Sequence, residues 1–316
     1  RQRQMCIRDR IATRESYGNS LKELAEEFPN LVVLDADLAA ATKTGIFRKA
    51  YPDRHIDCGI AESNMMGVAA GLSLVGKIPF VSSFAMFAAG RAFEQVRNSI
   101  GYPHLNVKIG ATHAGITVGE DGATHQCNED IALMRTIPGM VVMCPSDDVE
   151  ARAAVRAALE YEGPVYIRFG RAAVPVINDH PGYHFEIGKG TVVREGKDVT
   201  IVATGICVDS ALGAAKMLEE EGISAEVVNI CTIKPLDEEI IINSAKKTGK
   251  VVTVEEHSVI GGLGSAVCDC LCANHPVPVK KVGMQDVFGE SGSAAALVEK
   301  YGLDAKGVYK SVKEFL

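Results

Sequence analysis

Short apolar runs alternate with segments of helical spacing along this chain, and that alternation limits the possible folds. Residues 31–34, 80–81, 107–109, 140–143 and 165–167 are rich in aliphatic and β-branched side chains. Helical patterns lie between these runs. The order is typical of a doubly wound parallel sheet with helices on both faces, so the sequence predicts an α/β fold.

The alternation stops once and then resumes. Residues 176–190 are polar and rich in turn-forming residues, which indicates a linker. A second series of apolar runs begins at residues 199–202 and continues towards the C-terminus. We therefore predict a first domain over residues 11–175 and a smaller α/β domain over residues 191–316.

Composition excludes several classes of protein. The net charge is −7 and no stripe of Lys and Arg is present, so nucleic acid is not expected as a partner. No apolar stretch is long enough to cross a bilayer, and the N-terminus carries no apolar secretion signal. These features predict a cytoplasmic protein without a membrane association.

The nine cysteines are expected to be reduced. Several lie inside apolar runs, where buried thiols are common: Cys58, Cys144, Cys207 and Cys231. A second group, Cys268, Cys270 and Cys272, lacks the spacing of a zinc site. Neither disulfides nor a metal site is predicted.

One acidic residue, Glu62, stands between a short apolar strand at residues 56–58 and a helix of small and apolar residues at 65–72. That helix is apolar on every face, so both elements are predicted to be buried. An acidic side chain in a first helical turn often only complements the helix dipole. The segments that follow favour a chemical role instead.

Several motifs occur in the order found in one enzyme family. They are the tract at residues 59–65, the segment 79–90 that ends in Phe-Ala-Met-Phe-Ala-Ala-Gly, the segment 113–126 that contains Gly-Glu-Asp-Gly-Ala-Thr-His-Gln, and residues 135–140. Together they resemble the pyrimidine-binding domain of transketolase-type thiamine diphosphate enzymes. The resemblance begins near residue 11, so residues 1–10 are expected to be a foreign extension.

The resemblance implies a cofactor site. Glu62 matches the glutamate that bonds to a ring nitrogen of the pyrimidine and favours the imino tautomer, which makes the cofactor its own base. Phe84 and Phe87 match the aromatic wall of that ring. Asp37 matches an acidic residue close to the cofactor. Without Glu62, the two phenylalanines would be read equally well as ordinary core residues.

A substrate site is implied as well. His113 and His125 match histidines that bond to substrate oxygens and assist proton movement, so they join Glu62 as expected catalytic residues. Asp121 matches a residue that binds a sugar hydroxyl. Arg14 and Arg171 match arginines that hold the sugar phosphate. For each histidine, the alternative is a buried structural role.

Two substitutes for expected phosphate ligands are considered. Arg168 lies near Arg171 in sequence and could replace it. Position 41 often carries a serine in the family, and this chain has Ala41, for which Thr42 or Thr44 could compensate.

The chain lacks the Gly-Asp-Gly motif with which the family binds the cofactor's diphosphate and Mg²⁺. The metal ligands are therefore expected on a separate N-terminal subunit. The resemblance implies the C-terminal subunit of a split transketolase, active in an α2β2 assembly, that moves a two-carbon ketol unit between sugar phosphates through a thiamine adduct. Three alternatives remain: the β subunit of a 2-oxo-acid dehydrogenase, a 1-deoxyxylulose-5-phosphate synthase-like protein, and a non-catalytic interaction subunit.

Overall fold

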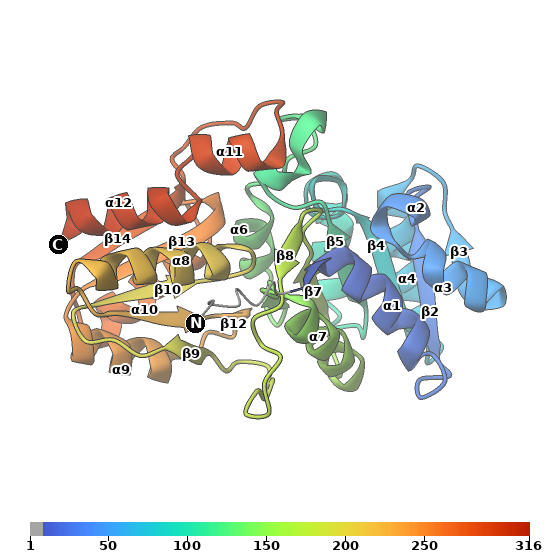
Figure 1. Ribbon diagram of the computed structural model, residues 1–316. Helices are drawn as coiled ribbons and strands as arrows, with labels where there is room; N and C mark the ends of the chain where they lie inside the picture. Colours follow the sequence, from blue (N-terminus) through green and yellow to red (C-terminus); the bar gives the residue numbers. More distant parts are fainter. Residues whose placement is uncertain (1–8) are drawn as a thin grey trace.

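Two α/β domains, each built around its own sheet, lie side by side in the computed structural model (Figure 1). The structure describes residues 9–316. The expectation of a foreign extension falls largely on residues 1–8, which lie outside the described part. Arg10 begins strand β1 (Arg10–Ala12), which pairs antiparallel with β8 (Ala173–Pro175) and so joins the two ends of the first domain.

The first sheet has seven strands in the order β12-β6-β7-β5-β4-β2-β3, and all its neighbours except β12 and β6 are parallel. Its strands from the first domain are β2 (Leu31–Asp35), β3 (His55–Asp57), β4 (Ile78–Phe84), β5 (Lys108–Thr112), β6 (Val141–Met143) and β7 (Val165–Arg168). The predicted α/β fold with a parallel sheet is confirmed. Strand β12 (Thr232–Lys234) comes from the second half of the chain and pairs antiparallel with β6.

Helices cover both faces of this sheet. On one face, α1 and α7 enclose a core that includes Leu21, Phe80 and Val155; on the other, α4 and α6 enclose a core that includes Met65 and Ile131. The helical segments are α1 (Thr13–Leu24), α2 (Ala39–Thr42), α3 (Gly45–Ala50), η1 (Pro52–Arg54), α4 (Glu62–Leu74), η2 (Met86–Arg91), α5 (Phe93–Gln95), η3 (Val96–Gly101), η4 (Ile116–Asp121), α6 (Asp130–Arg135) and α7 (Asp148–Glu160).

The second sheet has five strands in the order β14-β13-β10-β11-β9. They are β9 (Thr191–Arg194), β10 (Val199–Ala203), β11 (Ala225–Asn229), β13 (Val251–Ser258) and β14 (Val279–Met284), and only β9 runs antiparallel to its neighbour. The helices are α8 (Cys207–Glu220), α9 (Glu238–Thr248), α10 (Leu263–Asn274), α11 (Ala294–Lys300) and α12 (Ala305–Phe315). Helix α11 packs against η4 of the first domain, at the top of the molecule in Figure 1.

A buried ion pair lies where the two domains meet. Arg168 Nε is 2.9 Å from Asp130 Oδ2, and the Tyr166 hydroxyl donates to the same carboxylate oxygen at 2.8 Å. Arg168 also donates through Nη2 to the backbone oxygens of Cys127 and Glu256, and Glu256 belongs to β13 of the second domain. This pair thereby links the second sheet to the first.

Two local expectations are wrong. The strand at the Glu62 tract is an exposed edge strand, with Ile56 36% exposed, and α4 buries only one of its faces. Apolar composition fixes which residues can be buried, but not which neighbour covers them. Cys58 is accordingly half-buried rather than enclosed.

The glycine-rich turn at residues 261–264 starts helix α10. Leu263 and Gly264 donate their backbone N–H groups to the Glu255 carboxylate at 2.7 and 2.8 Å. A carboxylate thus occupies the helix N-terminus where a dinucleotide phosphate would bind in a nucleotide fold. Within residues 9–316, no helix has the length and apolarity needed to span a bilayer, and no cluster of His, Cys, Asp and Glu could hold a metal ion.

Candidate functional site

The expected site residues gather at the carboxyl ends of the first sheet's parallel strands, where open α/β sheets bind ligands. Glu62 follows β3 and is the first residue of α4, with an exposed fraction of only 2%. Its carboxylate oxygens lie 3.1 and 3.3 Å from Nη1 of Arg91, whose side chain is half exposed. A buried carboxylate therefore faces one half-exposed cationic partner.

Aromatic rings form a wall beside this ion pair. The Arg91 guanidinium lies 4.7 Å from the centre of the Phe87 ring, and the Phe84 and Phe87 rings stack with centroids 5.9 Å apart. Phe84 also stacks on the His113 imidazole at 3.9 Å, and His125 meets Phe87 edge-on at 5.5 Å. Four of the predicted residues are thus brought into one cluster.

His113 follows β5 directly and is held by two hydrogen-bond partners. Its Nε2 lies 3.2 Å from Nη1 of Arg14, and its Nδ1 lies 2.9 Å from Oγ1 of Thr112. Because a guanidinium can only donate, Nε2 accepts, and the proton of the neutral ring is on Nδ1 and is donated to Thr112. The backbone of His113 has a φ of +56°, which is uncommon for a residue with a side chain.

The surroundings of His113 keep it uncharged. Burial, and then the positive charges of Arg14 and Arg171, lower the pKa of His113 to about 3. A neutral imidazole can accept a proton from a substrate hydroxyl, whereas an imidazolium cannot. The arrangement therefore suits a neutral hydrogen-bonding group, because the lowered pKa makes the ring a weak proton acceptor.

The two predicted phosphate-binding arginines lie near each other. Arg14 donates to the Ala41 carbonyl at 2.9 Å, and its Nε is buried without a partner. Burial and the nearby Arg171 lower the pKa of Arg14. Arg171 donates to the Val118 carbonyl and is 3.4 Å from the Glu120 carboxylate. Two guanidinium groups with spare donors next to His113 provide a positive site for an anionic group.

Both expected substitutes for phosphate ligands are wrong. Arg168 is engaged by Asp130 in a buried ion pair of the first domain, so it cannot replace Arg171. The hydroxyl groups of Thr42 and Thr44 both donate at 2.9 Å to Oδ2 of Asp35 and are fully buried. Neither threonine has a hydroxyl hydrogen to offer a phosphate.

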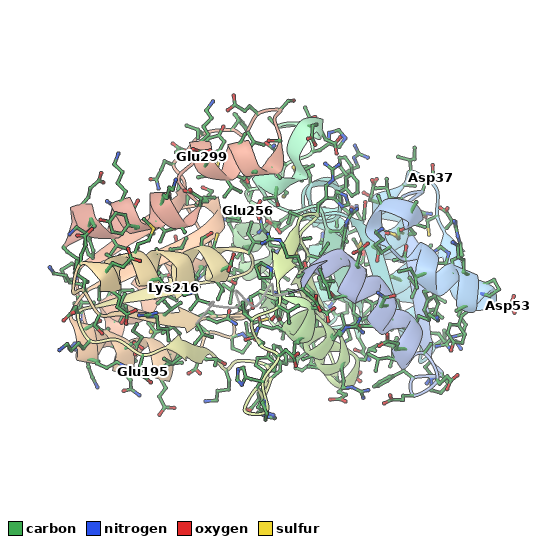
Figure 2. All side chains as sticks on the ribbon, in the orientation of Figure 1. Asp37, Asp53, Glu195, Lys216, Glu256 and Glu299 are labelled. Carbon is green, nitrogen blue, oxygen red and sulfur yellow. The ribbon has the colours of Figure 1, made fainter. Side chains whose placement is uncertain are left out.

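Asp37 and Asp121 lie at the rim. Asp37 follows β2, is exposed, and donates its backbone N–H to Asp57 Oδ1 at 3.1 Å; Figure 2 shows it at the outer edge of the first domain. Asp121 ends η4 and is also exposed. Both carboxylates are accessible from outside, but the contacts of this chain do not bring either one into the aromatic cluster.

A cavity of about 470 Å³ adjoins the aromatic wall. It is lined by Met86, Phe87, Arg91, Ala123, Thr124 and Phe288. An aromatic face next to a buried carboxylate fits an aminopyrimidine, which stacks through its ring and donates to an acceptor. Glu62, Phe84 and Phe87 would hold the pyrimidine of thiamine diphosphate; no acidic cluster that would hold its metal occurs in the described part of the chain.

Sequence reasoning missed two residues of this site. Arg91 follows Phe87 by one turn of a π-helical segment. An arginine at this spacing after the two phenylalanines could have been predicted to lie beside the aromatic wall. Phe288 reaches the cavity from the second domain and is 83% exposed. Its position depends on domain packing, for which the sequence carries no local signal.

The two sheets and the site define a two-domain α/β protein of the kind that binds a pyrimidine cofactor beside its first sheet. Residues 9–176 match the transketolase pyrimidine-binding domain, and residues 188–308 match the transketolase C-terminal domain. The chain therefore belongs to the transketolase family. Within it, the chain resembles a protein described as a putative transketolase C-terminal section and another described as a split gene transketolase.

Individual relatives agree. A putative transketolase C-terminal section from Methanocaldococcus jannaschii is 52% identical over 95% of both chains. A 6-deoxy-6-sulfo-D-fructose transketolase subunit from Clostridium sp. strain MSTE9 is 49% identical over 95% of this chain and 93% of the relative. A solved structure described as "Split gene transketolase, inactive beta4 tetramer" superposes with a TM-score of 0.90 at 60% identity, covering 96% of this chain and 98% of the other.

Longer relatives match only in part. A 1-deoxy-D-xylulose-5-phosphate synthase from Heliobacterium modesticaldum is 40% identical over 94% of this chain, which spans 46% of that protein.

Proposed function

We propose that this chain, joined to an N-terminal subunit, transfers a two-carbon ketol unit from a ketose phosphate to an aldose phosphate with thiamine diphosphate and Mg²⁺. The observation that carries the proposal is the buried Glu62 carboxylate beside the stacked Phe84 and Phe87 rings. Bound thiamine diphosphate would supply a nucleophilic carbon. Glu62 would accept a hydrogen bond from the pyrimidine, and Arg91 would have to release it first.

The remaining residues fit a sugar phosphate. Arg14 and Arg171 present guanidinium groups to an anionic end. His113, held neutral, would hydrogen-bond to a sugar hydroxyl once Arg14 turns from Nε2 to the anionic group, and His125, edge-on to Phe87, would assist proton movement. The rim carboxylate of Asp121 would bind a further hydroxyl.

The uncovered face of α4 is proposed as the docking surface for the N-terminal subunit. Leu74 and Val75 are 74% and 73% exposed, and nothing lies within 4 Å of a methyl group added at Gly67 or Gly71. The partner must reach Glu62 to complete one cofactor site, and this face is continuous with Glu62 on the same helix. In the assembled complex the partner would then cover the apolar face of α4 that is exposed in this chain.

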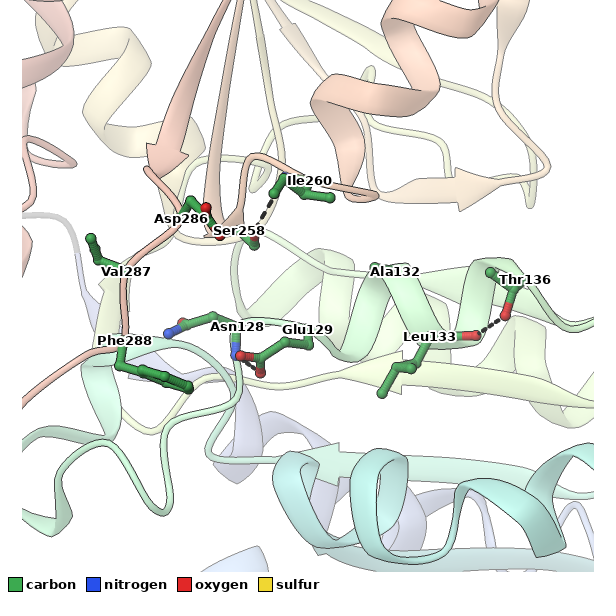
Figure 3. Close-up of a pocket in the computed structure, with 10 residues that line it drawn as sticks. All are labelled: Asn128, Glu129, Ala132, Leu133, Thr136, Ser258, Ile260, Asp286, Val287 and Phe288. Carbon is green, nitrogen blue, oxygen red and sulfur yellow. Dashed lines mark hydrogen bonds between the residues drawn. The ribbon is translucent and has the colours of Figure 1, made fainter.

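A second uncovered surface is proposed to bind another copy of this chain, as an α2β2 assembly requires. It surrounds a cavity of about 440 Å³ between α6 and the carboxyl ends of β13 and β14, with Ile260, Val287 and Phe288 exposed around it (Figure 3). The similar split transketolase is described as a β4 tetramer, which supports self-association of such chains. We also propose that the protein is located in the cytoplasm.

The test is reconstitution with the N-terminal subunit, thiamine diphosphate and Mg²⁺. Glu62→Ala should abolish turnover of a ketose phosphate and weaken cofactor binding measured by calorimetry, because the acceptor for the pyrimidine is removed. Glu26→Ala, an exposed residue in the turn after α1, serves as the control. Undiminished turnover by Glu62→Ala would exclude the proposed role.

The second candidate is a 1-deoxyxylulose-5-phosphate synthase-like reaction, favoured by the 40% identity to that enzyme. Its donor is a 2-oxo acid rather than a ketose phosphate. Release of CO₂ from pyruvate by the reconstituted complex, with no consumption of ketose phosphate, would select this candidate instead. The same assay with other 2-oxo acids tests the dehydrogenase alternative.

A further inference from the structure

The segment from His113 to Gln126, here called the substrate loop, is anchored by a carboxylate of the second domain. The backbone N–H of Thr117 donates to Oε1 of Glu256 at 2.6 Å. Glu256 lies in β13, is 4% exposed, and is found between the two domains in Figure 2. Burial raises the pKa of Glu256, and the Arg168 charge and the Thr117 hydrogen bond act against that rise.

The loop is shaped to receive this carboxylate. A Cβ atom at Gly115 would collide with the Glu256 carboxyl group, and Gly115 has a φ of +74°. Only glycine meets both conditions without strain. The loop and β13 therefore fit closely at one point, with a specific hydrogen bond beside it.

A second anchor lies at the other end of the loop. The Gln126 side chain is 3% exposed, and its Nε2 donates to the carbonyls of Ile116 and Gly119 at 3.3 Å and of Glu290 at 2.9 Å. Gly289 leaves the room that Gln126 fills. One amide thus joins two points of the loop to the segment of the second domain that leads to α11.

The backbone of the loop needs such support. His113 has a φ of +56°, and Gly119 interrupts η4 with a φ of +85° and a ψ of −122°. Conformations of this kind persist where the surrounding structure fixes them, and they are common at ligand sites. Two of the groups that hold the loop lie outside the first domain: the Glu256 carboxylate in β13, and the Glu290 carbonyl before α11 that Gln126 contacts.

We propose that Glu256 and Gln126 are positioning residues that hold the substrate loop in the conformation that presents His113 and His125, so the second domain takes part in sugar-phosphate turnover. The proposal rests on the proposed function of the site. Neither residue lines the cavity beside Phe87, so both act through the loop.

The first measurement is hydrogen–deuterium exchange of loop peptides in the isolated full chain. Glu256→Ala should raise exchange at residues 113–126 by about tenfold or more, because the Thr117 N–H loses its acceptor. In the reconstituted enzyme, kcat/KM for the ketose phosphate should fall by about tenfold or more, while the Kd for thiamine diphosphate stays unchanged. Glu256→Gln keeps an acceptor oxygen and should recover most of both losses.

Glu255→Ala is the matched control. Glu255 is the preceding residue in β13 and is equally buried, but its carboxylate accepts from Leu263 and Gly264 at the start of α10. Its loss should leave exchange of the substrate loop unchanged. If Glu256→Ala does not fold, Gln126→Ala tests the other anchor with the same two readouts.

The outcomes separate the two proposals. Unchanged loop exchange and unchanged kcat/KM in both Glu256→Ala and Gln126→Ala would overturn the positioning role. An equal effect of Glu255→Ala on loop exchange would also overturn it, because general loosening of β13 would then explain the result. A wild-type complex that consumes no ketose phosphate would reject the proposed function, and the exchange data would still decide whether the loop is held as inferred.

Discussion

The state of a single imidazole decides how the site handles protons. His113 has a pKa of about 3 in the folded chain, against an ordinary value of 6.5. Between these two values the unfolded chain binds a proton that the folded chain does not, so stability falls as the pH falls through this window. His113→Asn, which tolerates the same backbone conformation, removes this contribution.

We expect the wild type to lose about 1.5 kcal/mol more unfolding free energy than His113→Asn between pH 6.5 and pH 5. Urea denaturation of both proteins at the two pH values measures the difference, and contributions of other titrating groups cancel between them. A parallel pH dependence of the two proteins would show that His113 titrates normally.

For single residues, the sequence motifs correctly predicted which side chains gather around Phe84 and Phe87. They did not predict which charged residues pair with each other. One group contains or adjoins five of the predicted residues: Glu62, Phe84, Phe87, His113 and His125. They come together because their motifs lie at the carboxyl ends of neighbouring parallel strands. Proximity in sequence misled the interpretation of Arg168, because Arg168 ends β7 and its buried partner, Asp130, lies 38 residues away in α6. The roles of Asp37 and Asp121 stay predictions.

Among the elements, α4 and the loops around Ile260 carry the exposed apolar side chains for which partners are proposed. Leu74→Asp should weaken binding of the N-terminal subunit by about tenfold or more while leaving self-association intact, because a charge then faces an apolar partner. Ile260→Asp should do the reverse, lowering the mass of the isolated chain in solution. Leu74 and Ile260 are 74% and 60% exposed, so neither change disturbs the core.

Calorimetric titration of the partner and light scattering of the isolated chain measure the two effects, and each variant is the control for the other. Loss of both associations in one variant would mean that the two surfaces are not separate. Unchanged binding of the N-terminal subunit by Leu74→Asp would contradict the proposal that the subunit docks on α4.

The sequence predicted the central strands of both sheets, but it predicted neither the edge strands β9 and β12 nor the shapes of several helical segments. Helix α1 begins with Ala12 as its N-cap although Ala12 has no side chain that could cap it, and the Thr13 hydroxyl accepts from the Gly170 N–H at 2.9 Å. The π-helical turns of η2 and η3 also have no signature in residue spacing.

In the whole molecule, the two domains defined from the sequence are joined by a shared sheet and by buried contacts. Strand β12, from the second half of the chain, extends the first sheet through Thr232 and Lys234, and the Arg168–Asp130 pair joins the first domain to β13. A three-residue strand has too little pattern to be assigned to a distant sheet from sequence. The domain boundaries predicted from the linker therefore do not separate the two sheets completely, because β12 lies after the linker but belongs to the first sheet.

This sharing predicts how the molecule unfolds. Arg168→Leu leaves the Asp130 carboxylate buried without its cation, which should lower the free energy of unfolding by about 3–5 kcal/mol. The double variant Arg168→Leu with Asp130→Leu removes both charges and should regain a large part of that loss. Urea denaturation followed by circular dichroism measures each value, and the wild type should show one transition because the domains are joined. If Arg168→Leu changes stability by less than about 1 kcal/mol, or the double variant is as unstable as the sum of Arg168→Leu and Asp130→Leu, the buried pair does not stabilise the fold as its contacts indicate.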